Sequence, residues 1–383
     1  MQVVYALEEI PANITRSLFL AGPTPRSGDA KPWRQDALKL LEDIGFEDGT
    51  VFIPEPRDGS WHREYDRQVQ WEEDCLNVAD VILFWVPRDL DTMPAFTTNI
   101  EWGAWAASGK LVLGYPEGTE KMTYMQNYCD KWNIASSNTL SETIHSAIDF
   151  IGKGVERTGG ERFVPMYIWN TPQFQSWYGS QKVSGNRLDH ARVLYTFRPG
   201  NKKFVFLTIL HVDIYVASED RHKTNEFVMS RTDISSIVLC RRDADRLKSE
   251  VVLVREFRSP ANTKDSFIRE LPGGSSAKPN QDPLEIAAEE VHEETGFYLD
   301  SSRLQFETAK QLAGTFSSHK SHLFSAEITA EEVAWFKSQE GIPHGNISDS
   351  EMTFIEVATV KQLMDKEIEV DWSTLGMILS VVA

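Results

Sequence analysis

Short apolar runs alternate with helical segments along the first 150 residues of the chain. Residues 33–45, 101–110 and 141–154 have helical spacing of apolar positions. The runs between them lack the polar alternation of a half-exposed strand: SLFLAG (17–22), TVFIPEP (50–56), DVILFWVP (80–87) and LVLGYP (111–116). Strands that are apolar on both faces are typical of a parallel sheet covered by helices on both sides. The pattern predicts an α/β fold with a doubly wound parallel sheet.

The pattern changes near residue 155. One strong helix is expected over Pro283–Thr295, with Asp282 as its N-cap and Gly296 as its stop. Otherwise, strand-like runs separated by polar turns dominate: residues 163–169, 193–199, 203–217, 236–240 and 250–257. Residues 154–163 (GVERTGGERF) predict a linker. We therefore expect two domains, residues 1–154 and residues 155–383.

Charge limits the partners of the protein. The 383 residues carry a formal net charge of −18 at pH 7. Such an acidic surface repels nucleic-acid backbones and anionic lipids, and no stretch rich in Lys and Arg offsets it. We expect neither nucleic acid nor membrane as a partner, and small molecules as ligands, with divalent cations bringing phosphates and carboxylates together.

Three features favour a cytoplasmic protein. The N-terminal segment carries acids where a signal peptide carries basic residues. The longest apolar runs, such as residues 81–86, are far shorter than a membrane span. The three cysteines are odd in number and widely spaced, which predicts neither a disulfide framework nor a zinc site and suits a reducing compartment.

The predicted helix at 283–295 concentrates negative charge. Glu290 and Glu294 are four residues apart on one flank, and Glu293 lies beside them. Each like-charge pair costs an exposed helix only about 0.2–0.5 kcal/mol, so a solvated acidic face is one interpretation. The alternative is that the charge faces a cation.

The segment RELPGGSSAKPNQDPLEIAAEEVHEETGF (269–297) resembles the Nudix hydrolase signature, a glycine loop followed by a glutamate-rich helix. The resemblance implies an α+β fold, with a mixed sheet sandwiched by helices. It also implies a Mg²⁺ or Mn²⁺ site built on the loop from Gly274, with Glu290 and Glu294 as ligands and Glu293 in support. Two positions depart from the signature. Glu289 occupies the usual arginine position, and Gln281 stands where the first glutamate belongs.

Flanking residues resemble the ADP-ribose pyrophosphatase branch of that family. In VVLVREFRSP (251–260) and IRELPGG (268–274), the matching Arg258 and Glu270 would hold substrate and metal, although a structural ion pair is an equal alternative. A later segment, residues 345–364, resembles the closing part of that branch, whose loop supplies a catalytic carboxylate. Glu351 is the candidate.

The turn LFLAGPTPR (18–26) follows the first strand of the first domain. It lies at the carboxyl edge where doubly wound sheets bind ligands. Backbone amides near Gly22 and the side chain of Arg26 could hold a phosphate or a sugar there. A tight turn with a surface arginine is the commoner meaning of such residues.

The segment from Trp71 to Pro116, with TTNIEWG at 97–103, resembles the nucleoside 2-deoxyribosyltransferase family. The resemblance implies a Rossmann-like sheet and a glutamate nucleophile, matching Glu101, which attacks C1′ of the sugar. A carboxylate suits the oxocarbenium-like transition state of N-glycosidic cleavage. The alternative for Glu101 is an acid at a helix start, favoured by the helix dipole. A second acid should protonate the base or hold sugar hydroxyls: Asp74, with Glu72, Asp89 and Asp91 as alternatives.

Together the two resemblances predict a two-domain enzyme of nucleotide metabolism. The first domain would cleave or transfer an N-glycosidic bond. The second would hydrolyse ADP-ribose or a related nucleoside diphosphate derivative, with NAD as an attractive common substrate. In the alternative hypothesis the altered Nudix-like domain binds ADP-ribose without cleaving it and regulates the first domain. Both families commonly self-associate, so we expect a homo-oligomer.

Overall fold

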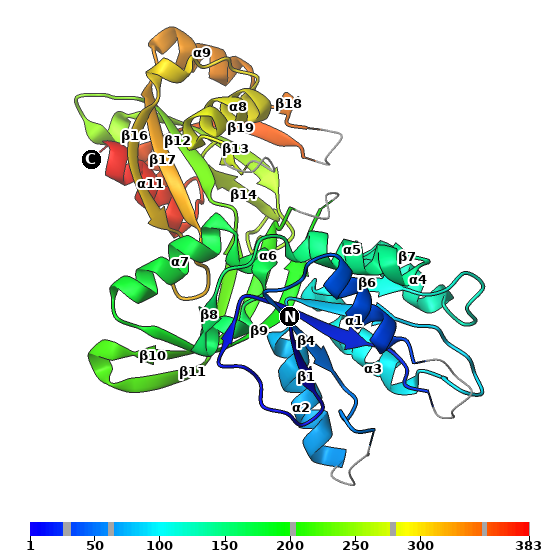
Figure 1. The fold of residues 1–383 in the computed structure, drawn as a ribbon. Coiled ribbons are helices and arrows are strands. Elements are labelled where there is room, and N and C mark those ends of the chain that lie inside the picture. Colours follow the sequence, from blue (N-terminus) through cyan, green and yellow to red (C-terminus); the bar gives the residue numbers. More distant parts are fainter. Residues whose placement is uncertain (26–31, 60–64, 200–203, 276–280, 347–350, 383) are drawn as a thin grey trace. The chain divides into compact units, whose positions relative to one another are not determined.

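The fold comes from a computed structural model, which describes residues 1–25, 32–59, 65–199, 204–275, 281–346 and 351–382. The chain forms two compact units, Met1–Arg231 and Thr232–Ala383 (Figure 1). None of the described helices is long and apolar enough to cross a membrane.

A six-stranded parallel sheet forms the centre of the first unit. Its strand order is β1 (Gln2–Tyr5), β4 (Gly49–Ile53), β3 (Arg16–Ala21), β5 (Val81–Trp85), β6 (Leu111–Gly114) and β7 (Ala135–Ser137). The central strands β4 and β5 are buried at every residue, because helices cover both faces. The parallel α/β sheet predicted from the apolar runs is thereby confirmed.

Alternate residues of β3 divide the core of this sheet into two layers. Leu18 and Leu20 pack with α1 (Arg34–Asp43) and α5 (Leu140–Ile151) on one face. Phe19 and Ala21 pack on the other face with α2 (Tyr65–Val78), α3 (Phe96–Trp105) and α4 (Thr123–Trp132). Helices on both faces make the sheet doubly wound.

The first unit continues well past residue 154. Its remaining elements are β2 (Asn13–Ile14), β8 (Arg157–Thr158), α6 (Met166–Trp169), α7 (Pro172–Val183), β9 (Arg187–Phe197), β10 (Leu207–Val216) and β11 (Arg221–Arg231). The last three form an antiparallel sheet in the order β11-β10-β9.

This division differs from the predicted boundary between residues 154 and 155. Arg157, in the predicted linker, is fully buried and forms an ion pair with Asp80 at 2.7 Å. The side chain of Asn77 donates to the backbone oxygen of Ala191, at 3.0 Å. A buried charge is tolerated only when it is paired, so these contacts anchor residues 155–231 to the first sheet.

A mixed sheet forms the centre of the second unit. Its order is β16 (Gln305–Gln311), β17 (Lys320–Glu327), β12 (Ile234–Arg241), β13 (Glu250–Phe257), β19 (Thr353–Thr359) and β18 (Pro343–His344), with β14 (Phe267–Glu270) on β13 and β15 (Gly273–Gly274) on β12. β12 and β17 are parallel, and the other pairs are antiparallel.

Helices pack on both faces of this sheet. One core contains α8 (Pro283–Thr295) and α9 (Ala330–Ser338), and the other contains α10 (Val360–Met364) and α11 (Trp372–Val382). α8 has its predicted bounds: the Asp282 side chain accepts from the Leu284 amide, and Gly296 has a φ of 70°. The architecture is a mixed sheet between helices, and the Nudix fold itself stays a prediction.

Two further findings differ from the sequence pattern. Residues 163–169 do not form a strand: they include a short helix, α6, which begins after Pro165. Single helical turns also occur at Ala106–Ser108, Gly159–Phe163, Ala217–Glu219, Arg246–Lys248 and Ser301–Arg303.

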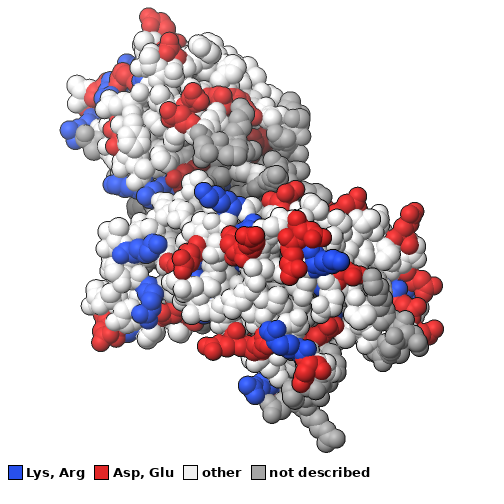
Figure 2. Space-filling view, in the orientation of Figure 1, with Lys and Arg blue, Asp and Glu red and all other residues white. Residues whose placement is uncertain are grey.

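On the face in Figure 2, basic side chains are scattered among acidic ones, and the described residues there form no continuous basic stripe.

Candidate functional site

A cleft of about 610 Å³ opens at the carboxyl ends of β3, β4 and β5 in the first unit. Residues that follow these strands line it, together with α1, α2 and α3. The chain passes from β3 to β4 on one side of the sheet, and from β5 to β6 on the other. The cleft therefore lies at a switch in strand order, where doubly wound sheets bind ligands, and its volume suits a small molecule.

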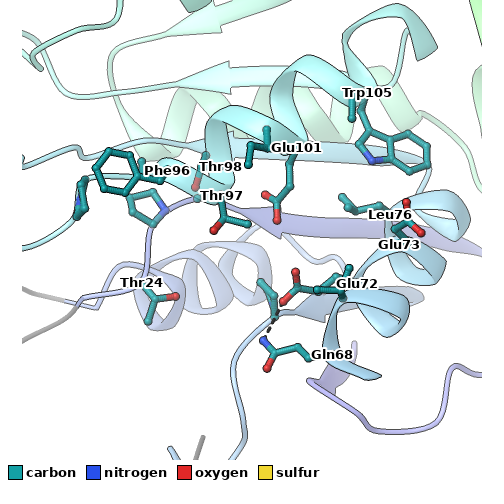
Figure 3. A pocket seen from close by; sticks show the side chains of 18 of the residues that line it. Thr24, Gln68, Glu72, Glu73, Leu76, Phe96, Thr97, Thr98, Glu101 and Trp105 are labelled. Carbon is teal, nitrogen blue, oxygen red and sulfur yellow. Dashed lines mark hydrogen bonds between the residues drawn. The ribbon is translucent and has the colours of Figure 1, made fainter. Parts of the chain in front are cut away.

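Two glutamates face each other across this cleft. Glu101 projects from α3 and Glu72 from α2, and their carboxylates point into the same space (Figure 3). The side chain of Gln68 donates to Oε1 of Glu72 at 2.9 Å and holds that carboxylate in place. The structure thus brings together Glu101 and one of the four acids weighed as its partner.

The electrostatics of the two glutamates are coupled. Burial, followed by repulsion from Glu72, raises the pKa of Glu101 to about 8, and Arg34 pulls it back. Burial also raises the pKa of Glu72, whereas the Gln68 hydrogen bond and the charge of Arg34 lower it. Two carboxyls in such a site share protons, so one can act as an acid while the other is ionised.

The position of Glu101 does not fit the helix-dipole interpretation. α3 begins at Phe96, after Ala95 in the left-handed region (φ 61°), and its first turn contains no acidic residue. Glu101 is beyond that turn, where the dipole has little effect. Its side chain instead helps to line the cleft.

Asp74, the first choice for the second acid, lies away from the cleft. It is exposed, and its Oδ1 accepts a hydrogen bond from the side chain of Gln70 at 3.0 Å. The geometry of α2 explains this, because residues two apart on a helix point in nearly opposite directions. Glu72 and Leu76, four apart, both line the cleft.

The other two candidate acids form a turn. Oδ1 of Asp89 accepts from the backbone amides of Asp91 (3.1 Å) and Thr92 (2.7 Å). Neither aspartate is among the described residues that line the cleft. Asp89 therefore stabilises the loop that leads to α3.

Gly22 lies at the cleft, as predicted. Its φ is 149°, and a Cβ at this position would lie 2.1 Å from the backbone oxygen of Trp85. Only glycine allows this close approach of the turn to β5. Arg26, predicted beside it, lies outside the described residues.

Arg34 is the residue of the cleft that sequence reasoning missed. It is the first residue of α1, lines the cleft and is 2% exposed. A cation in the first turn opposes the sign that the helix dipole favours. That unfavourable placement is the signal that could have identified it.

A second group of acids lies in the second unit, around α8. Glu294 is buried, and its Oε2 accepts from the backbone amide of Gly273 at 2.9 Å. Burial, and repulsion from Glu290, Glu270 and Glu256, raises the pKa of Glu294 well above its usual range. The structure thus brings together the candidate residues Glu270, Glu290 and Glu294, and adds Glu256.

Glu290 belongs to the same group. Burial, then repulsion from Glu293 and Glu351, raises its pKa to about 7. Glu293 itself is exposed. Next to the loop, a Cβ on Gly274 would lie 2.5 Å from Oε1 of Glu290, so the absence of a side chain lets that carboxylate lie against the backbone.

Arg258 pairs with two members of the group. Its Nη2 lies 2.8 Å from Oε2 of Glu256 and 3.6 Å from Oε1 of Glu270. The predicted pair of Arg258 and Glu270 is therefore present, but the closer partner is Glu256, which the sequence did not single out. One partly exposed guanidinium thus pairs with the buried Glu256 and the half-buried Glu270.

The two positions that depart from the Nudix signature contact each other. Nε2 of Gln281 donates to Oε2 of Glu289 at 2.9 Å. An amide donor and a carboxylate acceptor thus connect the loop to α8. The two residues that differ from the signature, Gln281 and Glu289, are therefore partners of each other in one hydrogen bond.

The donor chemistry of the acidic group suits a hard cation, because Mg²⁺ and Mn²⁺ prefer carboxylate oxygens. Carboxyls with pKa values raised by burial and by mutual repulsion would also gain from a neighbouring cation. Within the described residues, however, no three His, Cys, Asp or Glu side chains are arranged to hold a metal ion. Any metal site here would need further ligands or a rearrangement of these side chains.

Comparison with known proteins bears on the first unit. Residues 15–119 match a family model described as "Nucleoside 2-deoxyribosyltransferase like". The match covers the cleft residues Gly22, Arg34, Glu72 and Glu101, so the first unit contains a nucleoside 2-deoxyribosyltransferase-like domain. The resemblance of residues 155–383 to Nudix hydrolases stays a prediction. No curated protein matches the chain in sequence.

Proposed function

We propose that the first unit cleaves or transfers the N-glycosidic bond of a nucleoside or nucleotide. The observation that carries this proposal is the opposition of Glu101 and Glu72 in one cleft, within the segment that matches the family model. This geometry supports a nucleophile and an acid on opposite sides of a sugar–base bond.

In this proposal the two carboxyls share one proton, and an Oε of Glu101 attacks C1′ of the sugar in the form that has this proton on Glu72. The C1′–N bond breaks, the bonding electron pair leaves with the base, and protonated Glu72 donates a proton to a base that leaves as an anion; nicotinamide, which leaves NAD as a neutral molecule, needs no proton. The product is a glycosyl ester on Glu101. Water or a second base then attacks C1′ and releases the carboxylate, which gives hydrolysis or transfer.

For the second unit we propose Mg²⁺-dependent hydrolysis of ADP-ribose or a related nucleoside diphosphate derivative. Glu290 and Glu294 would hold the ion, and the exposed Glu293 would support them. The ion supplies charge that offsets the diphosphate. Glu351 interacts electrostatically with both Glu290 and Glu256, which supports its candidacy as a catalytic carboxylate.

A common substrate would explain why the two units share a chain. NAD contains both an N-glycosidic bond to its nicotinamide and a pyrophosphate. Release of nicotinamide by the first unit would leave ADP-ribose, which the second unit would hydrolyse to AMP and ribose 5-phosphate. NAD is therefore the first substrate to test.

The alternative proposal makes the second unit a sensor that binds ADP-ribose without hydrolysing it. Replacement of the usual arginine by Glu289, now paired with Gln281, favours this alternative. Loss of residues that orient metal ligands typically lowers activity about 10–100-fold.

One experiment tests both proposals. The protein is incubated with NAD, ADP-ribose and a panel of nucleosides, with and without Mg²⁺, and products are identified by mass spectrometry. Base release that is independent of Mg²⁺ supports the first unit's activity, and Mg²⁺-dependent AMP from ADP-ribose supports hydrolysis by the second. Calorimetric binding of ADP-ribose without AMP supports the sensor. Absence of both products and of binding contradicts the account.

A further inference from the structure

Arg34 is the buried cation of the cleft. The charged residues described along the cleft are Arg34 from α1, Glu72 and Glu73 from α2, and Glu101 from α3. Burying a guanidinium is costly unless hydrogen bonds and a counter-charge replace water. The contacts of Arg34 show how this cost is met and what the residue holds in place.

The guanidinium binds the end of β3 and the turn that follows it. Nε donates to the backbone oxygen of Leu20 at 3.1 Å, and Nη2 donates to that of Gly22 at 2.7 Å. Nη1 donates to Oγ1 of Thr24 at 3.1 Å and forms an ion pair with Glu55. The planar fork of arginine suits such fixed, multiple acceptors, which a lysine could not satisfy in the same way.

The positive charge of Arg34 also acts on the two facing glutamates. It lowers the pKa of Glu101 and that of Glu72, against the effect of burial. Glu55 contributes most to the favourable charge interactions of Arg34, followed by Glu101 and Glu72. Glu55 and the two cleft glutamates therefore compete for one cation.

We propose that Arg34 is a positioning residue of the cleft: it fixes the turn after β3 and keeps a positive charge beside Glu72 and Glu101, so that one carboxylate is ionised while the other retains its proton. Glu55, the ion-pair partner of Arg34, partly neutralises the positive charge of Arg34. The inference rests on the proposed glycosidic function of the cleft and adds the residue that divides the roles of the two acids.

The test is the pH dependence of kcat/KM for base release in wild type, Arg34→Gln and Glu55→Gln. Because the two glutamates must hold one proton between them and the pKa of Glu101 is raised to about 8, the wild-type kcat/KM should decrease along an alkaline limb with its midpoint near that pH. Loss of the nearby cation should shift this limb to higher pH by about one unit in Arg34→Gln. Loss of the competing carboxylate should shift it to lower pH in Glu55→Gln.

Opposite shifts separate this proposal from a merely structural role. A structural role lowers thermal stability and kcat/KM in both variants without moving the limb. Arg34→Lys, which keeps the charge but loses the fork, should raise KM and leave the limb near its wild-type position. An unmoved limb in Arg34→Gln, or shifts of both variants in one direction, would overturn the proposal.

A readout without turnover separates failure of this inference from failure of the proposed function. The carboxyl carbons of glutamate are labelled with ¹³C, and the Glu101 signal is assigned by its loss in Glu101→Gln. Its NMR titration midpoint should rise in Arg34→Gln and fall in Glu55→Gln, whether or not the protein releases any base. Unchanged midpoints contradict the role of Arg34, whereas shifted midpoints without base release contradict only the glycosidic function.

Discussion

Both units bury glutamates, but they compensate the charge in different ways. In the first unit a fully enclosed arginine, Arg34, is fixed by four acceptors next to Glu72 and Glu101. In the second unit Arg258, 40% exposed, pairs with Glu256 and Glu270 and lowers the pKa of Glu290, whereas Glu294 is repelled by the other carboxylates. The first site has a built-in cation and suits chemistry by side chains alone. The second retains an excess of negative charge, which is the basis of the proposed Mg²⁺ site.

The largest expected effect concerns Glu101. Glu101→Gln should lower base release on the order of 10⁴-fold or more, because the amide cannot act as a covalent nucleophile. Steady-state kinetics by chromatography of the released base checks this. Glu117→Gln, which changes an exposed acid of the same unit, should behave like wild type. Base release by Glu101→Gln at the wild-type rate would refute the assignment.

The second acid gives the next largest effect. Glu72→Gln should lower kcat roughly 10²-fold or more, because a general acid contributes about 10²–10⁴-fold to such a reaction. Asp74→Asn should have little effect, since Asp74 is exposed and points away from the cleft. Kinetics with the same nucleoside compares the two variants. The reverse result would restore Asp74 as the partner of Glu101.

Added Mg²⁺ should distinguish the second unit from the first. An ion at about 100 times its dissociation constant stabilises a folded unit by about 2.7 kcal/mol. Because the pKa of Glu290 is raised to about 7, protons compete with the ion below that pH, and the stabilisation should be larger at pH 8 than at pH 6. Calorimetric unfolding with and without Mg²⁺ measures it.

The control for the Mg²⁺ experiment keeps the same helix. Glu290→Gln should abolish the stabilisation, whereas Glu285→Gln, an exposed acid in the first turn of α8, should retain it. Equal stabilisation of wild type and Glu290→Gln would place the ion elsewhere. It would also remove the contrast between the two acidic sites.

The smallest expected effect concerns Gln281 and Glu289. Gln281→Glu should destabilise the second unit, since two carboxylates would then meet. Adding Glu289→Arg should restore stability, with a coupling energy of about 0.5 kcal/mol. A double-mutant cycle from chemical unfolding measures this coupling. As a control, Gln281→Glu combined with Glu331→Arg, a change on α9, should show no coupling energy. A coupling energy of similar size in this control would mean that the effect does not come from direct contact of residues 281 and 289.

Much of the fold could be predicted because the local signals were strong. The strands β5 and β6, which lie within the apolar runs 80–87 and 111–116, are buried at every residue, and α8 has a clear cap and stop. The helix α6 was missed because a short, fully apolar run has no period that separates helix from strand. The compact units divide after Arg231 and not after residue 154, and the sequence pattern does not show this because the contact of Arg157 with Asp80 joins residues far apart in sequence.

Residues of the candidate sites could also be predicted from the sequence only where a local signal marks them. Glu101, Glu290 and Glu294 lie in short motifs, so sequence could single them out. Arg34 and Glu256 become informative only through burial and pairing, which single residues in a sequence do not reveal. The choice between Glu72 and Asp74 depended on the rotation of α2, which the motif alone did not determine.

Trapping of the intermediate tests the central claim most directly. The protein is mixed with a substrate that releases its base, quenched in acid within the first turnover, digested and mapped by mass spectrometry. The account predicts a sugar ester on the peptide that contains Glu101, absent from Glu101→Gln. Rapid base release with that peptide unmodified, or with the sugar on another side chain, would contradict it.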